Sequence, residues 1–441
     1  MNHSREVRWL NSELPKLTET GIINEETAAR IRDHYFNQDE KPAYNIALII
    51  TSILGALLIG GGITLIFAYN WEDLSRSSRT ILSFAPLITA QLFFGFAYFF
   101  RKDSLAWKES TSGFLMLMMG TSIALIDQTY SLGGRMQDFV LTWMLLTIPL
   151  IYLANSTLVS ILYMMGIAWW TSLTGSFFYY GEDIYYWVLI IAVIPHLLIN
   201  TDPKNITIRS NILGWTFAIS LVLAANWIIP VKYAPYRYLL KGCIYAALYL
   251  VGKYYYAKGS TMWARPFQTV GIAGVAISSM ILSYKWHFMF EDISDWFRES
   301  DYEGTAHVIN IALVSIFSTL YLGMIIFHKI KKNHFNYFVP LYPWLVLAGI
   351  YLYNIDHSRL TVILFNLFIF AYGIYYLVNG FKQRTIALVN AGMAFISALI
   401  LIRFFDSHVS FLVKGTAFII VGVGFLVANI ILLKKMKKHA A

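Results

Sequence analysis

The residues best suited to chemistry gather in one short polar stretch of an otherwise apolar chain. Two carboxylates, an amide, a phenol and a guanidinium occur within twelve positions: Asp127, Gln128, Tyr130, Arg135 and Asp138. Two adjacent glycines between them allow the backbone to turn sharply. Arg135 suits an anionic headgroup, and Asp127 suits a proton relay. The alternative is that Asp127 or Asp138 only neutralises Arg135 at a tight loop.

A second polar set occurs late in the sequence, where two apolar runs meet. Arg403 ends one run, Asp406 follows in the turn, and Lys414 comes early in the next run. Arg403 and Asp406 are three positions apart and can pair at a helix end, while Lys414 can reach back toward the same surface. We take both sets as candidate substrate-binding residues, with structural anchoring as the alternative for the second.

The composition decides which solvent surrounds these residues. Of the 441 residues, 57% are hydrophobic and 13% are charged, and the mean hydropathy is +0.56. A soluble domain carries about 25% charged residues, so most of this chain cannot face water. A disordered protein, a nucleic-acid binder with a basic face and a soluble enzyme are excluded. The composition predicts an all-α, polytopic transmembrane helix bundle in contact with membrane lipids.

Apolar runs of about the ~20 residues that a bilayer crossing needs follow one another after Tyr44. The third and fourth runs are short, and the Asn155-Ser156 break between the fourth and fifth is also compatible with a re-entrant hairpin. We predict about fourteen spans, at 46–69, 79–100, 113–126, 139–154, 157–174, 184–199, 210–229, 236–256, 266–284, 305–327, 335–353, 360–379, 385–402 and 410–433.

The distribution of lysine and arginine predicts the orientation. With fourteen spans and a cytoplasmic N-terminus, 23 of the 34 basic residues fall on the cytoplasmic side and 9 on the other, while Lys241 and Lys414 lie inside spans. Cytoplasmic loops are enriched in lysine and arginine. We therefore expect a multi-pass protein of the inner cell membrane with both termini in the cytoplasm.

The chain begins with a polar segment that is typical of a small helical hairpin. Gly21 supplies a stop after the first helix, and Asn24 supplies an N-cap for the second. The predicted organisation is a cytoplasmic helical hairpin at 1–43, a transmembrane helical domain at 44–433 and a basic tail at 434–441.

Motifs of soluble catalysis are missing from the sequence. Gly422-x-Gly424 lies inside a predicted span and is no phosphate loop, and the single Cys243 excludes an intrachain disulfide. We expect no metal, no cofactor and no nucleic-acid partner, and the sequence leaves the oligomeric state open. His196, next to Pro195 inside a span, is interpreted as a hydrogen-bonded packing residue.

Several of these features recur together in a known family. They are the N-terminal pattern from Trp9 to Tyr35, the glycine-rich first span that ends at Asn70-Trp71, the Asp127-to-Tyr130 stretch followed by Asp138-Phe139, and the closing Arg403-to-Asp406 turn with Lys414. This combination resembles the bacterial membrane family called domain of unknown function 2157, mainly over the first third of the chain. The resemblance implies a multi-pass membrane protein and no particular activity.

The sequence leaves three functions open. The first is a transporter or flippase for a small or lipid-linked anionic substrate, which the charges near the span ends favour. The second is a membrane scaffold or sensor without catalysis, with the N-terminal hairpin as its reader. The third is an intramembrane enzyme acting on lipid-linked sugars through Glu72 and Asp73, although the loop that carries them is short.

Overall fold

The computed structural model describes residues 10, 13–36, 73–101, 103–174, 185–202, 206–228, 234–256, 261–285, 303–332, 335–355, 357–383 and 385–404, with isolated positions between 410 and 427. The described residues form α-helices joined by turns and loops, which confirms the all-α class. The chain divides into two compact units, 1–79 and 80–441. The predicted domain boundaries at 43/44 and 433/434 lie outside the described residues.

The first unit contains the N-terminal hairpin. Residues 13–19 are helical, and Gly21 follows with a positive φ of 70°, the left-handed conformation that ends helices. Helix α2 (Glu25–Phe36) comes next. The side-chain oxygen of Asn24 accepts a hydrogen bond of 2.9 Å from the backbone N–H of Thr27, so the predicted N-cap is confirmed.

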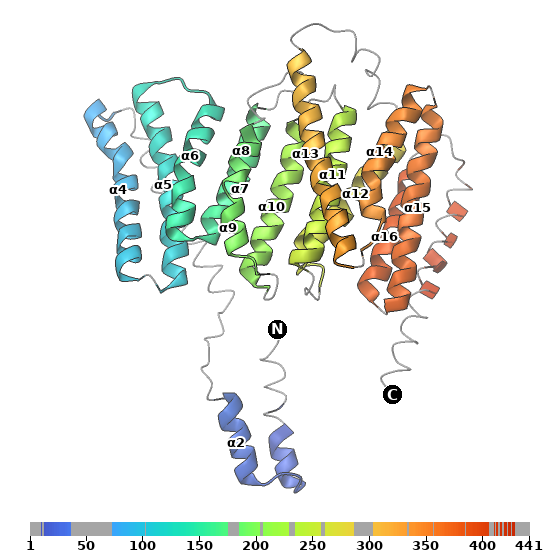
Figure 1. Ribbon diagram of the computed structural model, residues 1–441. Coiled ribbons are helices and arrows are strands. Elements are labelled where there is room, and N and C mark those ends of the chain that lie inside the picture. Colours follow the sequence, from blue (N-terminus) through green and yellow to red (C-terminus); the bar gives the residue numbers. More distant parts are fainter. Residues whose placement is uncertain are drawn as a thin grey trace. The chain divides into compact units, whose positions relative to one another are not determined.

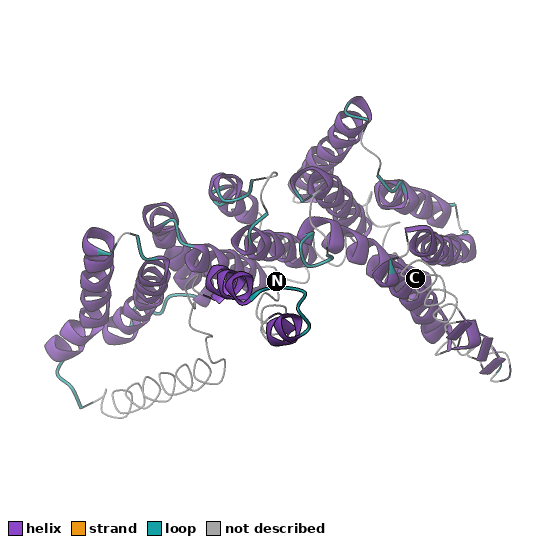
Figure 2. Cartoon of the chain, turned by 90° about the horizontal axis from the view of Figure 1, so that it is seen from below, coloured by secondary structure: helices purple, strands orange, loops and turns teal. Residues whose placement is uncertain are grey.

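The second unit is built from helices that run in alternating directions, if α8 and α9 are taken together (Figure 1). Figure 2 shows the same helices seen from below. Their bounds are α4 (Arg76–Phe100), α5 (Leu105–Tyr130), α6 (Met136–Ala154), α7 (Thr157–Thr174), α8 (Tyr186–Ile191), α9 (Ile194–Ile199), α10 (Ile208–Trp227), α11 (Ala234–Tyr255), α12 (Pro266–Lys285), α13 (Glu303–Ile330), α14 (Phe338–Asn354), α15 (Ser358–Gln383) and α16 (Ile386–Phe404).

The lengths of these helices fit a bilayer. Among the described residues, eight helices are long and apolar enough to cross a membrane, and three further apolar segments are shorter, at Tyr186–Ile199, Phe338–Tyr353 and Ile386–Ile402. A helix of 20 residues is about 30 Å long, close to the hydrocarbon thickness of a bilayer. The predicted first span, at 46–69, lies outside the described residues, and the last, at 410–433, is described only at isolated positions.

Two predicted spans differ from the helices found. Helix α5 begins at Leu105 rather than at 113, because Ser104 caps it by accepting a hydrogen bond from the backbone N–H of Trp107. The predicted span at 184–199 is interrupted between α8 and α9. Pro195 lacks the N–H that would bond to the carbonyl oxygen of Ile191, and the backbone of Ala192 and Val193 stays in the right-handed helical region, so the interruption is a two-residue turn within one span.

The turn between α6 and α7 bears on whether these helices are two separate spans or one re-entrant hairpin. Asn155 adopts a left-handed conformation with φ 44° and ends α6, and α7 starts at Thr157. Each helix is long and apolar enough to cross the bilayer by itself. This favours two separate spans over the re-entrant hairpin.

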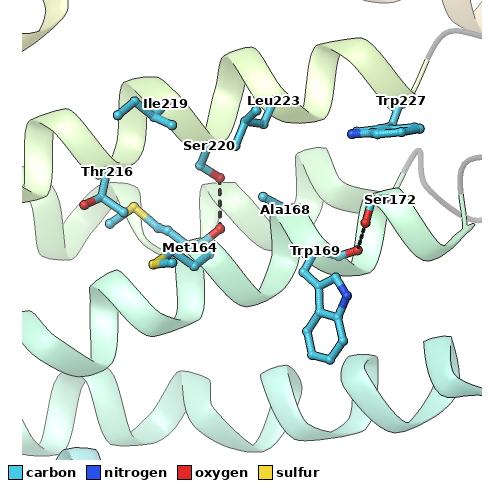
Figure 3. Close-up of a pocket in the computed structure, with 10 residues that line it drawn as sticks. Met164, Ala168, Trp169, Ser172, Thr216, Ile219, Ser220, Leu223 and Trp227 are labelled. Atoms are coloured by element: carbon cyan, nitrogen blue, oxygen red, sulfur yellow. Dashed lines mark hydrogen bonds between the residues drawn. The ribbon is translucent and has the colours of Figure 1, made fainter.

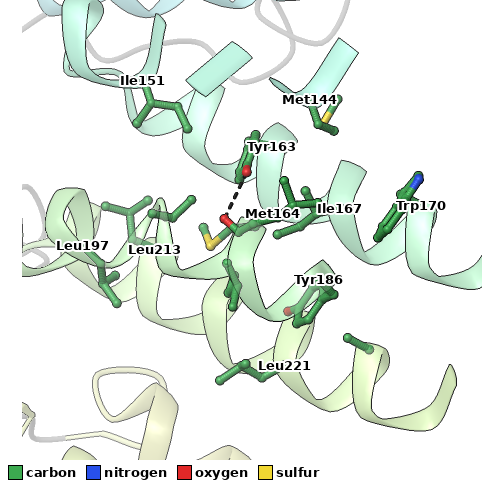
Figure 4. Packing of buried hydrophobic residues seen from close by; sticks show 14 of the residues in the cluster. Met144, Ile151, Tyr163, Met164, Ile167, Trp170, Tyr186, Leu197, Leu213 and Leu221 are labelled. Atoms are coloured by element: carbon green, nitrogen blue, oxygen red, sulfur yellow. Dashed lines mark hydrogen bonds between the residues drawn. The ribbon is translucent and has the colours of Figure 1, made fainter. Parts of the chain in front are cut away.

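The second unit has two main cores. The first surrounds α7, which packs on α5, α6 and α10, and it buries Tyr163, Trp170 and Tyr186 completely (Figure 4). The second surrounds α11, which packs on α10, α12, α13 and α14 and contributes buried residues along most of its length. The two cores meet along α10 and α11.

Close backbone approach joins the last described helices, α15 and α16. A Cβ atom placed on Gly392 would lie 2.6 Å from the backbone oxygen of Gly373 and 2.6 Å from the backbone nitrogen of Leu377. Small residues at such contacts let membrane helices pack backbone to backbone. The α15–α16 pair therefore depends on the absence of a side chain at Gly392.

Candidate functional site

The predicted polar stretch lies at one end of α5 and α6. Asp127 accepts a long hydrogen bond of 3.4 Å from the backbone N–H of Gly134, which ties the end of α5 to the following turn. The hydroxyl of Tyr130 lies 2.9 Å from that of Thr80 on α4. Gln128 lies in the same last turn of α5. The stretch is therefore held by local contacts within the second unit.

Arg135 and Asp138 form an ion pair within this stretch. The guanidinium donates two hydrogen bonds of 2.9 Å to the two carboxylate oxygens, across three positions at the start of α6. Both side chains are about half exposed, at 58% and 48%. One of the two interpretations of this stretch was that Asp138 neutralises Arg135. That interpretation requires an ion pair between these two side chains, and the structure contains it. Any anion that binds Arg135 must compete with Asp138.

The second predicted set is not located by the structure. The side chain of Arg403, together with Asp406 and Lys414, lies outside the described residues, as does Glu72. The backbone of α16 extends to Phe404, and this helix packs on α15 and α12, whereas α5 packs on α6 and α7. Binding roles for Arg403, Asp406 and Lys414 stay predictions.

A different polar group, which we call the His196 network, lies at the interruption between α8 and α9. His196 is 2% exposed, although it sits in an apolar segment. Its Nδ1 atom lies 3.0 Å from the hydroxyl of Ser160 on α7, and its Nε2 atom lies 3.0 Å from the side-chain oxygen of Asn155. Hydrogen bonding of His196 was predicted from the sequence, but its partners were not.

Tyrosine side chains satisfy the backbone at the interruption. The hydroxyl of Tyr163 donates to the carbonyl oxygen of Leu189 at 3.0 Å, and that of Tyr152 donates to the carbonyl oxygen of Ala192. These carbonyl groups lie beside the point where the helix is broken. A broken helix is tolerated inside a membrane only where neighbouring groups satisfy the backbone atoms that the break releases.

Arginine and amide groups close the other side of the His196 network. Arg209 donates from Nη2 to the backbone oxygen of Asn155 and, at 3.2 Å, to its side-chain oxygen. The amide of Asn200 donates to the same side-chain oxygen, also at 3.2 Å. The Nε atom of Arg209 is buried and has no hydrogen-bond partner among the described residues. Arg209 Nε is therefore a buried donor that the described side chains leave unsatisfied.

Glu109 completes the His196 network from α5. Its carboxylate accepts hydrogen bonds from the hydroxyl of Ser156 (2.5 Å) and from the backbone N–H groups of Thr157 (2.9 Å) and Leu158 (2.8 Å). The first N–H groups of a helix have no partner within the helix and carry a partial positive charge. Glu109 thus caps α7 from a helix about 47 positions earlier in the chain.

The geometry gives the network a defined chemistry. When the Ser160 hydroxyl donates to the backbone oxygen of Ser156 at 2.8 Å, His196 Nδ1 must donate to Ser160. The Nε2 atom also faces an oxygen, that of Asn155. A neutral imidazole has one N–H and can satisfy both contacts only if the Ser160 hydroxyl turns. The network therefore accepts either tautomer of His196, depending on how the Ser160 hydroxyl is turned.

Sequence reasoning missed Glu109, Asn155, Ser160 and Arg209 as members of one site. The available signals were the Pro195-His196 pair inside an apolar run and the Asn155-Ser156 break. Nothing local indicated that Glu109 reaches α7. Among the described residues, no group of three or more histidine, cysteine or acidic side chains is placed to hold a metal ion.

A groove of about 510 Å³ runs between α7 and α10 (Figure 3). Its walls are mainly apolar, and all three of its hydroxyls are engaged. Ser220 donates to the backbone oxygen of Met164 at 3.0 Å, Ser172 to that of Trp169 at 2.7 Å, and Thr216 to that of Ile212 at 3.0 Å. Such a surface suits an acyl chain better than a charged solute. The lining residues are Met164, Met165, Ala168, Trp169, Ser172, Thr216, Ile219, Ser220, Leu223 and Trp227.

Comparison with known proteins finds a family match over the first third of the chain. No curated protein and no solved structure matches the sequence. A family model does match, from the N-terminal hairpin to the first turn of α7. Together with the apolar helices, this match indicates that the protein lies in a membrane. Residues 15–160 match the family described as "Predicted membrane protein (DUF2157)", which confirms the resemblance seen in the sequence.

Proposed function

We propose that this membrane protein is a transporter or flippase that moves a small or lipid-linked anionic substrate across the bilayer. The observation that carries the proposal is the interruption between α8 and α9, with the buried His196 beside it. The interruption places the buried His196 beside Ser160 and Asn155 of neighbouring helices. In transporters, broken helices place backbone and polar groups where a substrate or coupling ion passes.

The charges of the His196 network support a functional role. Ionisable side chains of membrane helices that pair with one another often mark substrate or ion pathways. Glu109 and Arg209 bring opposite charges to one network at the ends of α5 and α10. The unpartnered Nε atom of Arg209 adds a donor that suits an anion.

The remaining predicted residues are compatible with the same function. Asp127, Gln128, Tyr130, Arg135 and Asp138 lie at the opposite end of α5 from Glu109, and Arg403, Asp406 and Lys414 are predicted near a second helix end. We propose them as residues of a substrate entrance. The apolar groove between α7 and α10 supports the lipid-linked form of the substrate.

The variant Pro195→Ala tests the interruption. Alanine restores a backbone N–H and favours a continuous helix, so we expect the initial flux to fall by about tenfold, equivalent to about 1.4 kcal/mol. Flux is measured in proteoliposomes with inorganic phosphate as soluble probe and with a fluorescent phosphatidylglycerol as lipid probe. The matched control is Pro149→Ala, because Pro149 lies inside the continuous helix α6 and its removal should leave flux unchanged.

Two outcomes would contradict this proposal. If neither probe crosses the membrane faster in vesicles that contain the protein than in empty vesicles, the protein does not transport anions of these two types. Full flux in Pro195→Ala would show that the interruption has no part in transport. Monodisperse elution of each variant in detergent separates a loss of flux from a loss of folding.

A further inference from the structure

The groove between α7 and α10, which we call the α7–α10 groove, has a buried floor and exposed rims. Met164, Ala168 and Ser220 are buried and form the floor. Both helices are long and apolar enough to cross a membrane, so their exposed apolar side chains face lipid. The rim side chains are 38–60% exposed, and they are Met165, Trp169, Ile219, Leu223 and Trp227.

The α7–α10 groove has the length of one leaflet. Figure 3 shows Met164 and Thr216 toward one end of the groove and Ser172 and Trp227 toward the other. The first two residues lie near the middle of their helices, whereas the last two lie at or near the helix ends. At 1.5 Å per residue, the groove follows α7 for about 12 Å and α10 for about 17 Å. Half of a hydrocarbon layer ~30 Å thick measures about 15 Å.

The hydroxyls of the α7–α10 groove already donate to backbone oxygens. Ser220 donates to Met164, which ties α10 to α7 at the bottom of the groove. Ser172 and Thr216 each donate to a backbone oxygen of their own helix. A ligand in the groove therefore binds mainly through van der Waals contacts, which are individually weak and add up along a close fit. A hydrocarbon chain meets this requirement.

The position of the α7–α10 groove favours a lipid over a further membrane helix. A helix that crosses the bilayer can pack along about 30 Å of its neighbours, whereas this groove ends near the middle of α7 and α10. Trp227 is the last residue of α10, and tryptophan is enriched at the depth of the lipid headgroups. A lipid with its headgroup at that depth can fill the groove with one chain that ends near the bilayer midplane.

We propose that the α7–α10 groove binds one acyl chain of a phospholipid from the leaflet that contains the C-terminal ends of α7 and α10. The chain lies along the two helices over Ala168 and Ser220, and the headgroup lies beside Trp227. This inference goes beyond the proposed function, because such a site needs no transport activity. It belongs to the transport path only where the bound phospholipid is also the substrate.

The test uses phosphatidylglycerol and phosphatidylcholine that each carry a photoactivatable diazirine in the middle of one acyl chain. Each probe is added at a low fraction to phosphatidylcholine nanodiscs that contain the full chain, and the labelled residues are mapped by mass spectrometry. We expect both probes to label the groove more strongly than the exposed face of α15 around Phe370 and Ile374, which also faces lipid. Equal labelling of the two surfaces in wild type would overturn the proposal.

The variant Ala168→Phe fills the floor of the α7–α10 groove. We expect it to reduce labelling of the other groove residues at least tenfold, equivalent to about 1.4 kcal/mol. The matched control is Ala371→Phe, which places the same ring on the exposed face of α15 and should leave labelling of the groove unchanged. Ser172→Phe, at the headgroup end, replaces Ala168→Phe if that variant does not elute as a monodisperse protein.

Three further results would also overturn the proposal. The first is unchanged labelling of the groove in a folded Ala168→Phe variant. The second is labelling by the phosphatidylglycerol probe alone, which would mean that the headgroup is recognised rather than the chain. The third is an unlabelled groove together with a lower molecular mass of Ala168→Phe in light scattering, which would mean that a second copy of the chain covers the groove.

These outcomes differ from a failure of the transport function. A groove that is labelled in a protein without flux in proteoliposomes leaves the lipid site intact and removes transport. Flux that persists in Ala168→Phe after labelling is lost removes the groove from the transport path and leaves transport intact. Labelling and flux are therefore measured on the same preparations.

Discussion

Replacing Gly392 by alanine is expected to lower the free energy of unfolding by about 2–3 kcal/mol, near the upper end of overpacking effects. The new methyl group would lie 2.6 Å from the backbone oxygen of Gly373 and the backbone nitrogen of Leu377. Backbone atoms cannot rotate away as a flexible side chain can. Helices α15 and α16 must therefore separate over their shared surface. Unfolding in mixed detergent micelles measures the change.

A second glycine provides the matched control. Gly323 lies on α13, and a Cβ atom placed on it would have no atom within 4 Å. Because alanine favours helices over glycine by about 1 kcal/mol, Gly323→Ala should be neutral or stabilising. Equal effects of the two variants would show that the close approach of α15 and α16 does not exist in the protein.

Replacing Glu109 by alanine is expected to cost about 3 kcal/mol of unfolding free energy, because hydrogen bonds to charged groups contribute about 1.5–3 kcal/mol and N-caps about 0.5–2 kcal/mol, and the terms overlap. The change removes a charged acceptor and leaves the buried hydroxyl of Ser156 and two backbone N–H groups at the start of α7 without it. Chemical denaturation in micelles, followed by tryptophan fluorescence, measures the loss.

Two further variants make this result specific. Glu109→Gln keeps one acceptor oxygen without the charge and should lose about half as much stability. Ser110→Ala changes the exposed neighbour of Glu109 and should behave as wild type. If Glu109→Ala matches Ser110→Ala, the contact between α5 and α7 contributes nothing to stability. The His196 network would then be held by α6, α7, α9 and α10 without a contribution from α5.

The stability variants also bear on the proposed function. Glu109 belongs to the network beside the interruption, whereas Gly392 lies in the α15–α16 pair. Variants at these two sites are expected to combine additively in stability, because they share no contacts. A loss of flux that is larger for Glu109→Gln than for Gly392→Ala, although Glu109→Gln is expected to lose less stability, would support a role of the network in transport.

Local signals in the sequence were enough to predict that most of the chain lies in lipid, where the helices lie and where some of the turns fall. Runs of apolar residues are read directly from the chain, because the bilayer requires a fixed length of them. Caps are similarly local: Asn24 contacts Thr27 three positions on, and Arg135 meets Asp138 at the same spacing. The family resemblance over residues 15–160 was visible for the same reason.

Only the tertiary structure decided which polar residues meet. Glu109 reaches Ser156 across 47 positions, and His196 reaches Asn155 across 41. The burial of Lys241 depends on the helices that surround α11. All of the apolar runs fit the bilayer equally well, and lipid tails are as apolar as the helix surfaces. The runs therefore give little indication of which helices pack against one another. The side-chain contacts that choose the neighbours, and with them the candidate sites, arise only when the helices have packed.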